Sequence, residues 1–251
     1  KWIAPIPKVP DPHLDDLRPL GLLEPLRKVW MGIFVRRIWK FWKEAKVINP
    51  AQHGSVPGRS TATAVAQIID ALETAKELKS TLYVSSWDIR RAFDSVSKPL
   101  MQLALRRLGI PEDLVCMFLK VDEGGAVVRT PYAIQEIKRG RLKEELSFQQ
   151  ERGIPQGDVA SPMIWVAVFD IVLDALGRAE GGTFYTKDRD GTSLPMGDVA
   201  YADDLLSVQG TYDGIQRKAD MMSAVCRILG FELATKKFRA FVYQWGNAHW
   251  H

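Results

Sequence analysis

The stretch Val199-Ala200-Tyr201-Ala202-Asp203-Asp204-Leu205-Leu206 places two adjacent carboxylates between two short apolar runs. Such runs around a short polar segment predict a β-hairpin with both aspartates at its tip. An Asp-Asp pair is also common in turns for purely local reasons, so the pair alone identifies no chemistry. A third acidic residue, Asp88, stands near the end of the buried strand predicted for residues 82–89.

These carboxylates point to a divalent metal ion. An ionised carboxylate at the edge of a buried strand is costly to desolvate unless it has a partner. Mg²⁺ is such a partner, because it takes one or two carboxylates and completes its shell with waters and substrate phosphates. Two such ions can activate an attacking 3′-hydroxyl and stabilise a leaving pyrophosphate.

Composition limits the class of protein. The chain has 251 residues, 46% of them hydrophobic and 25% charged, which excludes collagen-like, coiled-coil and fully disordered chains. The uncharged run Val159–Phe169 is too short to span a bilayer and no signal peptide is recognisable, so no membrane partner is expected. Cys116 and Cys226 lie far apart without histidines nearby, so we expect reduced thiols in a nuclear or cytoplasmic protein.

Positive charge is concentrated in the first 60 residues, which hold 11 Lys and Arg against 5 Asp and Glu. This excess suggests a polyanionic partner, although a solvated basic face is an equally good explanation. Within residues 20–46, basic side chains such as Arg36, Arg37 and Lys40 alternate with tryptophans. They either contact a nucleic-acid template or belong to a helix whose tryptophans are core residues or form a docking face.

The periodicity predicts a mixture of helices and strands that do not alternate regularly, which is typical of the α+β class. The proline-rich opening, residues 1–16, predicts an extended arm or edge strand. Helices are predicted over residues 20–46, 61–79, 98–108, 112–120, 161–176 and 212–229, with strands and turns over 124–152, short strands over 191–208 and a strand-like tail after Gly230.

Five blocks in order resemble the reverse transcriptase family. The hairpin Tyr201–Asp204 resembles its catalytic hairpin, and the blocks before it are Leu17–Leu20, Gln52–Thr61, Asp88–Asp94 and Gly153–Pro162. An ordered set of blocks is far more specific than any single one. The likeness is greatest to non-LTR retrotransposon and group II intron enzymes, and it implies RNA-directed DNA synthesis on an RNA template from a DNA or RNA primer.

The resemblance implies the metal site. It makes Asp88, Asp203 and Asp204 the catalytic carboxylates, with Asp88, Asp203 and the Ile89 carbonyl as metal ligands. The implied cofactor is Mg²⁺, two ions, with Mn²⁺ as a substitute.

The resemblance also implies nucleotide and template contacts. Phe93 matches a steric gate that excludes a 2′-hydroxyl, and without the other blocks it would be taken for a core phenylalanine. The remaining residues implied to contact the incoming dNTP are Lys8, Arg18, Gln156, Gly157, and Lys236 or Lys237. Template contacts are implied for Gln52, Gly54 and Arg59. The family usually has Phe after the glycine of that block, whereas this chain has Ser55.

The expected architecture is a right-hand polymerase with fingers over residues 1–80 and a palm over 81–251, some fingers strands being interleaved near 124–152. We expect the palm to be an antiparallel sheet packed on helices. The 47 residues after Asp204 leave no room for a helical thumb, so other domains of a larger polyprotein are expected partners. A non-catalytic nucleic-acid-binding or protein-binding remnant of a retroelement is the alternative, favoured by Ser55 and the missing thumb.

Overall fold

The computed structural model describes residues 1–11, 13, 17–120, 125–130, 137, 146–179, 181–187, 190–244 and 247–250. The chain divides into two compact units. Unit 1 comprises residues 1–46 and 93–165, and unit 2 comprises residues 47–92 and 166–251. The predicted boundary at residue 80 is not a boundary between these units, and the division into fingers and palm stays a prediction.

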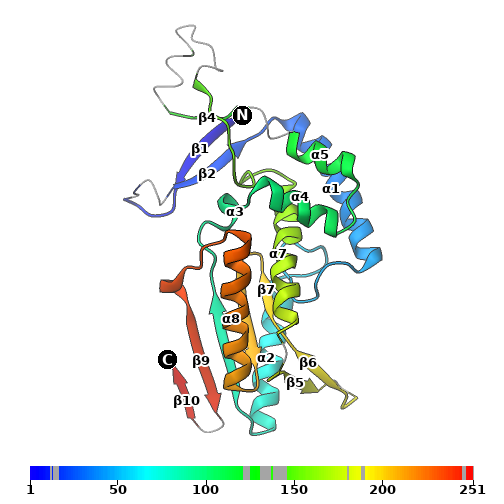
Figure 1. Cartoon of the computed structure of the whole chain (residues 1–251), viewed down its shortest axis with the longest axis vertical. Coiled ribbons are helices and arrows are strands. Elements are labelled where there is room, and N and C mark those ends of the chain that lie inside the picture. Colours follow the sequence, from blue (N-terminus) through cyan, green and yellow to red (C-terminus); the bar gives the residue numbers. More distant parts are fainter. Residues whose placement is uncertain are drawn as a thin grey trace. The chain divides into compact units, whose positions relative to one another are not determined.

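Unit 1 combines a small sheet with helices (Figure 1). Its elements are β1 (Trp2–Pro7), β2 (Leu17–Leu22), α1 (Pro25–Ala45), most of α3 (Ala92–Ser95), α4 (Lys98–Arg107), α5 (Glu112–Lys120), β4 (Val127–Val128) and the first turn of α7 (Ser161–Gly177). Most of the segment predicted as strands and turns near residues 124–152 lies outside the described residues.

The sheet of unit 1 has the strand order β2-β1-β4 among the described residues. β1 pairs antiparallel with β2 along its whole length, but it pairs with β4 only at Trp2 and Ile3. Among the described residues, β1 is therefore paired on one side only from Ala4 onward, where prolines are tolerated, as expected for an edge strand. The helix predicted from residue 20 begins instead at Pro25, because Leu17–Leu22 forms a strand against β1.

Helix α1 buries one side and exposes the other. Met31, Val35, Ile38 and Trp42 are buried at helical spacing. The Trp42 indole N–H donates to the Leu108 carbonyl at 3.0 Å, which ties α1 to the end of α4. Trp42 is thus a core residue, as one explanation of this segment predicted, whereas Trp30 is exposed.

Unit 2 is built on an antiparallel sheet. Its described elements are α2 (Thr61–Glu77), β3 (Leu82–Trp87), the rest of α7, β5 (Phe184–Lys187), β6 (Ser193–Met196), β7 (Val199–Tyr201), β8 (Asp204–Gln209), α8 (Tyr212–Leu229), the 3₁₀ helix η3 (Thr235–Lys237), β9 (Arg239–Gln244) and β10 (Asn247–Trp250). In the part of the chain that the structure describes, the strand order of the larger sheet is β10-β9-β3-β8-β7, and β5 and β6 form a separate hairpin.

Helices α2 and α8 cover opposite faces of the larger sheet, with α8 in front in Figure 1. The small side chains Ala64, Ala71 and Ala75 of α2 pack with Val84 and Val208 of the central strands. Because side chains alternate along a strand, the neighbouring residues of β3 and β8 point to the α8 face. These observations confirm the predicted α+β class and the antiparallel sheet packed on helices.

Local signals explain the helix boundaries that the sequence predicted correctly. Ser60 and Thr63 form a capping box at the start of α2. Gly230 ends α8 in the left-handed conformation, with φ 76°.

No helix in the described ranges combines the length and the apolar character needed to cross a lipid bilayer.

Candidate functional site

Asp88 lies at the end of the central strand of the larger sheet. It follows β3 directly, and its side chain is 19% exposed. Pairing continues past the strand end, because Ala234 N–H donates to the Asp88 carbonyl and Arg90 N–H donates to the Glu232 carbonyl, both at 2.8 Å. Neither bond uses the Ile89 carbonyl oxygen, the predicted third ligand.

Asp203 and Asp204 belong to the hairpin of β7 and β8. Tyr201 pairs with Asp204, so the turn consists of Ala202 and Asp203. The prediction that both aspartates form the tip is therefore corrected, since Asp204 is the first residue of β8. Trp87 pairs with Leu205 in the neighbouring strands, and continuing this register by one residue sets Asp88 opposite Asp204.

The carboxylates act on one another electrostatically. Burial raises the pKa of Asp203 above its ordinary value, and repulsion from Asp204 and Asp88 raises it further, while Lys237 opposes the shift. The ammonium of Lys237 donates to Asp88 Oδ2, and this bond raises the pKa of Lys237. The site is thus rich in negative charge and already attracts one cation.

The structure separates the two candidate lysines. The pairing of residues 232–234 with residues 88–90 leads the chain into η3, which brings Lys237 to Asp88. Lys236 takes part through its backbone carbonyl, which accepts a hydrogen bond from the Arg239 guanidinium at 3.0 Å.

The donor set suits Mg²⁺ bound together with a substrate. Within the described ranges, no three His, Cys, Asp or Glu side chains lie close enough to hold a metal ion by themselves. Mg²⁺ does not need such a cage, because one or two carboxylates with waters and phosphates suffice. Asp88 and Asp203 would hold the ion, and its charge would relieve the repulsion that raises the pKa of Asp203.

The loop between α1 and α2 is fastened to β7, the edge strand beside the aspartates. Ala200 N–H donates to the Ala51 carbonyl at 2.8 Å, and His53 N–H donates to the Ala200 carbonyl at 2.7 Å. The Arg59 guanidinium donates to three backbone carbonyls of this loop. The distances are 3.0 Å to Asn49, 3.2 Å to Pro50 and 2.5 Å to Gln52.

The three predicted template residues thus make contacts inside unit 2. Gln52 is fully buried, and its side chain bonds to the Ala202 backbone. A Cβ at Gly54 would lie 2.0 Å from the Ala202 nitrogen, so only glycine fits there. Template binding by Gln52, Gly54 and Arg59 stays a prediction.

Three of the predicted nucleotide residues of unit 1, Phe93, Gln156 and Gly157, lie in or near the loop that precedes α7. The Phe93 ring stacks on Trp165 with 5.2 Å between centroids. The side-chain amide of Gln156 donates to Asp94 Oδ1 at 3.2 Å, and the backbone carbonyl of Gln156 accepts from Gly21 N–H at 2.7 Å. Gly157 has φ +97°, and a Cβ there would meet the Gly21 carbonyl at 3.0 Å, so this position requires glycine.

The sequence did not indicate the ion pair that supports this loop. Arg27 of α1 donates to Asp158 Oδ2 at 2.7 Å, and the Asp158 side chain is only 5% exposed. Arg18 lies exposed on β2, the strand that the loop contacts, and Lys8 lies exposed after β1. The carboxylates with Lys237 therefore form one group in unit 2, and Phe93 with the predicted loop residues forms another in unit 1.

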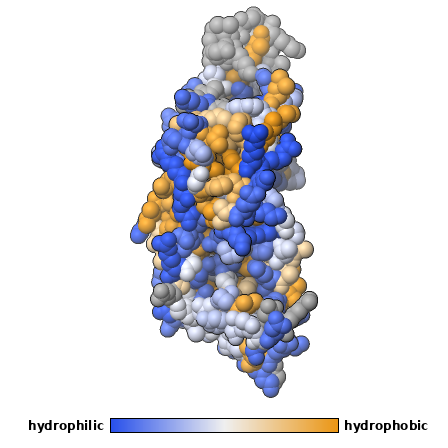
Figure 2. Space-filling view, turned by 90° about the vertical axis from the view of Figure 1, so that its right-hand side faces the viewer, coloured by the Kyte–Doolittle hydropathy of each residue, from blue (hydrophilic) through white to orange (hydrophobic). Residues whose placement is uncertain are grey.

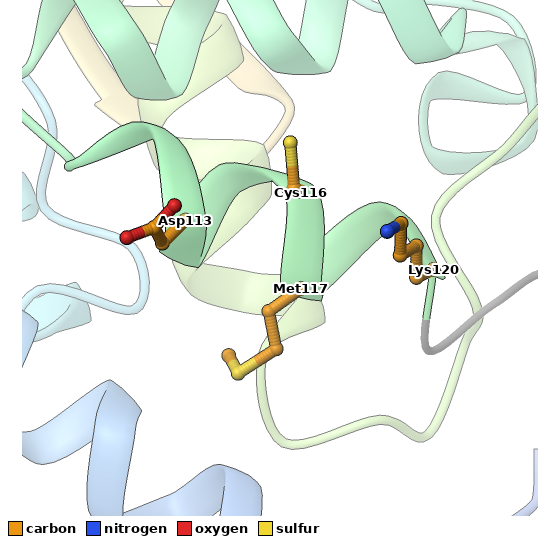
Figure 3. Close-up of a pocket in the computed structure, with 4 residues that line it drawn as sticks. All are labelled: Asp113, Cys116, Met117 and Lys120. Carbon is orange, nitrogen blue, oxygen red and sulfur yellow. The ribbon is translucent and has the colours of Figure 1, made fainter.

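Two further surface features involve none of the predicted catalytic residues. α5 borders a shallow hollow of about 500 Å³ lined by Asp113, Cys116, Met117 and Lys120 (Figure 3). α1 exposes Leu26, Val29 and Trp30, and Figure 2 shows apolar side chains at the surface on the side of the molecule that carries this helix. The basic residues of α1 at positions 36, 37 and 40 are exposed.

Comparisons with known proteins agree on one family. The family profile described as "Reverse transcriptase (RNA-dependent DNA polymerase)" matches residues 6–247. A retrovirus-related Pol polyprotein from type-1 retrotransposable element R2 of Popillia japonica is 27% identical over 88% of this chain, and one from Nasonia vitripennis is 25% identical over 92%. The chain spans only 29% and 21% of these two relatives.

Solved structures resemble the fold. A telomerase from Candida albicans in complex with the TWJ fragment of telomeric RNA has a TM-score of 0.60 at 12% sequence identity. The match covers 89% of this chain and 35% of the telomerase chain. A telomerase from Candida tropicalis, also in complex with a TWJ fragment, has a TM-score of 0.59 at 14% identity, covering 98% and 41%. The predicted polymerase-type fold is confirmed by these likenesses.

Proposed function

The chain belongs to the reverse transcriptase family, and from this membership we propose that it carries out RNA-directed DNA synthesis. In this reaction deoxynucleotides are added to the 3′-hydroxyl of a primer on an RNA template. We propose that the chain is a part of a retroelement polyprotein, because it spans less than a third of its R2 relatives.

The observation that carries the proposal is the group of Asp88, Asp203 and Asp204 with Lys237 at the strand ends of one sheet. Two Mg²⁺ ions bound there would supply Lewis acidity to the attacking hydroxyl and the leaving pyrophosphate. Asp88 and Asp203 would hold the ions, whose positive charge would offset the repulsion that Asp204 and Asp88 exert on Asp203. Lys237 lies beside Asp88 and would offer its ammonium to the leaving phosphate.

The second group of residues serves the incoming nucleotide in this proposal. Phe93 limits space beside the sugar, and its stacking on Trp165 supports a fixed ring orientation. Gln156 and Gly157 line the path of the nucleotide, and Arg18 and Lys8 provide exposed cations for its phosphates. The complexes of telomerase with RNA support an RNA template, and the two free cysteines support a reducing nuclear or cytoplasmic compartment.

Primer extension on an RNA template tests the function. With Mg²⁺ and dNTPs, we expect the wild-type chain to extend the primer and Asp203→Asn to lose at least 100-fold in rate. Asp70→Asn is the matched control, because Asp70 is an exposed carboxylate of α2 in the same unit, and it should keep the wild-type rate. Equal extension by both variants would contradict the role of Asp203. Absence of extension by the wild-type chain, with Mg²⁺ or Mn²⁺, would favour the non-catalytic remnant.

A further inference from the structure

One buried side chain connects the loop before α2 to the turn that carries Asp203. The Gln52 amide pairs with both polar backbone groups of Ala202: its Oε1 accepts from Ala202 N–H at 3.0 Å, and its Nε2 donates to the Ala202 carbonyl at 3.1 Å. The same Oε1 also accepts from Gly54 N–H at 2.8 Å. Since β7 ends at Tyr201, the Gln52 side chain takes the place of a strand partner for Ala202.

Ala202 has a backbone conformation that alanine rarely adopts. Its φ is +58°, whereas Asp203 is not among the residues with positive φ. In two-residue hairpin turns, a positive φ at the first central position alone is typical of the type in which glycine stands there. An alanine in this place is strained, and such strain persists only where surrounding contacts fix it.

The loop that carries Gln52 offers a firm base for these contacts. Arg59 donates three hydrogen bonds to backbone carbonyls of this loop and so holds them together. In addition, Asn49 N–H donates to Asp170 Oδ1 of α7 at 2.7 Å. Gly54 touches the turn so closely that no side chain fits between them. A displacement of the turn therefore requires that the Gln52 amide first give up its bonds.

We propose that Gln52 is a positioning residue, which holds Ala202 in its left-handed conformation and thereby aims the Asp203 carboxylate at the metal site. The proposal rests on the proposed function for its catalytic consequence, but the contact with Ala202 stands without it. It differs from the expected template contact, because a fully buried amide with both ends bonded is unable to meet a template base without breaking these bonds.

Four variants test the proposal. Gln52→Met keeps the shape of the side chain and removes its three hydrogen bonds, two to Ala202 and one to Gly54. Ala202→Gly allows the positive φ without strain, and the double variant combines the two changes. Gln209→Met is the matched control, because Gln209 is 3% exposed at the far end of the same hairpin and its Oε1 has no partner among the described residues.

The expected kinetic result is a loss in kcat. A small misplacement of a catalytic group can cost about 100-fold, so we expect Gln52→Met to lower kcat by about 10- to 100-fold. The KM for dNTP and the Kd for primer–template should stay within about twofold, because the hydrogen bonds of the Gln52 amide go to Ala202 and Gly54 of the chain itself. The double variant should recover kcat at least threefold over Gln52→Met, and Gln209→Met should keep the wild-type kcat.

Urea unfolding of the same proteins gives a readout that needs no activity. The midpoint shifts of Gln52→Met and Ala202→Gly should be non-additive, with the double variant more stable than the sum predicts. Additive shifts, or a weakened Kd for primer–template with kcat unchanged, would overturn the proposal. If the wild-type chain extends no primer, the proposed function fails, and the coupling between positions 52 and 202 still decides whether the contact exists.

Discussion

Removal of the buried ammonium of Lys218 should destabilise the protein strongly. Lys218 Nζ donates to Asp198 Oδ2 at 2.8 Å and to the Leu176 carbonyl at 2.7 Å, and the two side chains of the ion pair are only 5% and 4% exposed. Lys218→Met leaves the Asp198 carboxylate buried without its counter-ion. Asp198 Oδ1 already has no hydrogen-bond partner among the described residues, so the carboxylate would lose its ammonium partner at Oδ2 as well.

The magnitude follows from the burial of the pair. Removing one partner of a buried ion pair costs about 3–5 kcal/mol, because an uncompensated charge remains in a medium of low polarity. A domain is stable by only about 5–15 kcal/mol, so this change takes away a large part of the total. Arg178→Met is the comparison, since Arg178 pairs with Asp174 on the surface with side chains 76% and 39% exposed. Such a pair contributes about 0.3–0.5 kcal/mol.

Urea unfolding followed by tryptophan fluorescence measures both variants. We expect Lys218→Met to lower the free energy of unfolding at least fivefold more than Arg178→Met. A second variant, Lys218→Met with Asp198→Leu, removes both charges and should regain most of the loss, because an apolar pair of similar size needs no counter-ion. Equal losses for Lys218→Met and Arg178→Met, or no recovery in the double variant, would refute the reasoning.

Two further predictions concern single titratable groups. Burial raises the pKa of the Cys226 thiol to about 12, so iodoacetamide at pH 8 should modify the half-buried Cys116 in the native protein and Cys226 only after unfolding. Mass spectrometry of the labelled peptides checks this, and equal labelling rates would contradict it. Burial lowers the pKa of His53 below 6.5, so as the pH falls from 7 to 5 the unfolded chain gains a proton before the folded one, and stability decreases. His53→Gln should show a shallower decrease in urea midpoint over this range, and an unchanged slope would argue against this assignment.

Helices were predictable because their signals are local. The spacing of apolar residues along α8 and the glycine that follows it both lie within the segment itself, and the predicted bounds 212–229 agree with the structure. The same holds for α2, whose capping box is made by Ser60 and Thr63.

Strand β2 was predicted wrongly because strands depend on partners. Residues 20–22 have apolar spacing that continues into α1, so the pattern favoured a helix from residue 20. The decisive interaction is the pairing of Leu17–Leu22 with Trp2–Pro7, which no local pattern reveals. Short elements such as α3 were also missed, since four residues are too few for a period to appear.

The sequence by itself determined the family, the order of its blocks and the identity of the carboxylates, because these depend on residue type and spacing along the chain. Only the tertiary structure decided which lysine meets Asp88, and it gave Gln52 a contact with the turn that carries Asp203. The two contacts join residues that are 149 and 150 positions apart in the sequence. Such contacts arise from the pairing of strands and bridges across the sheet, and their geometry is absent from any local stretch of sequence.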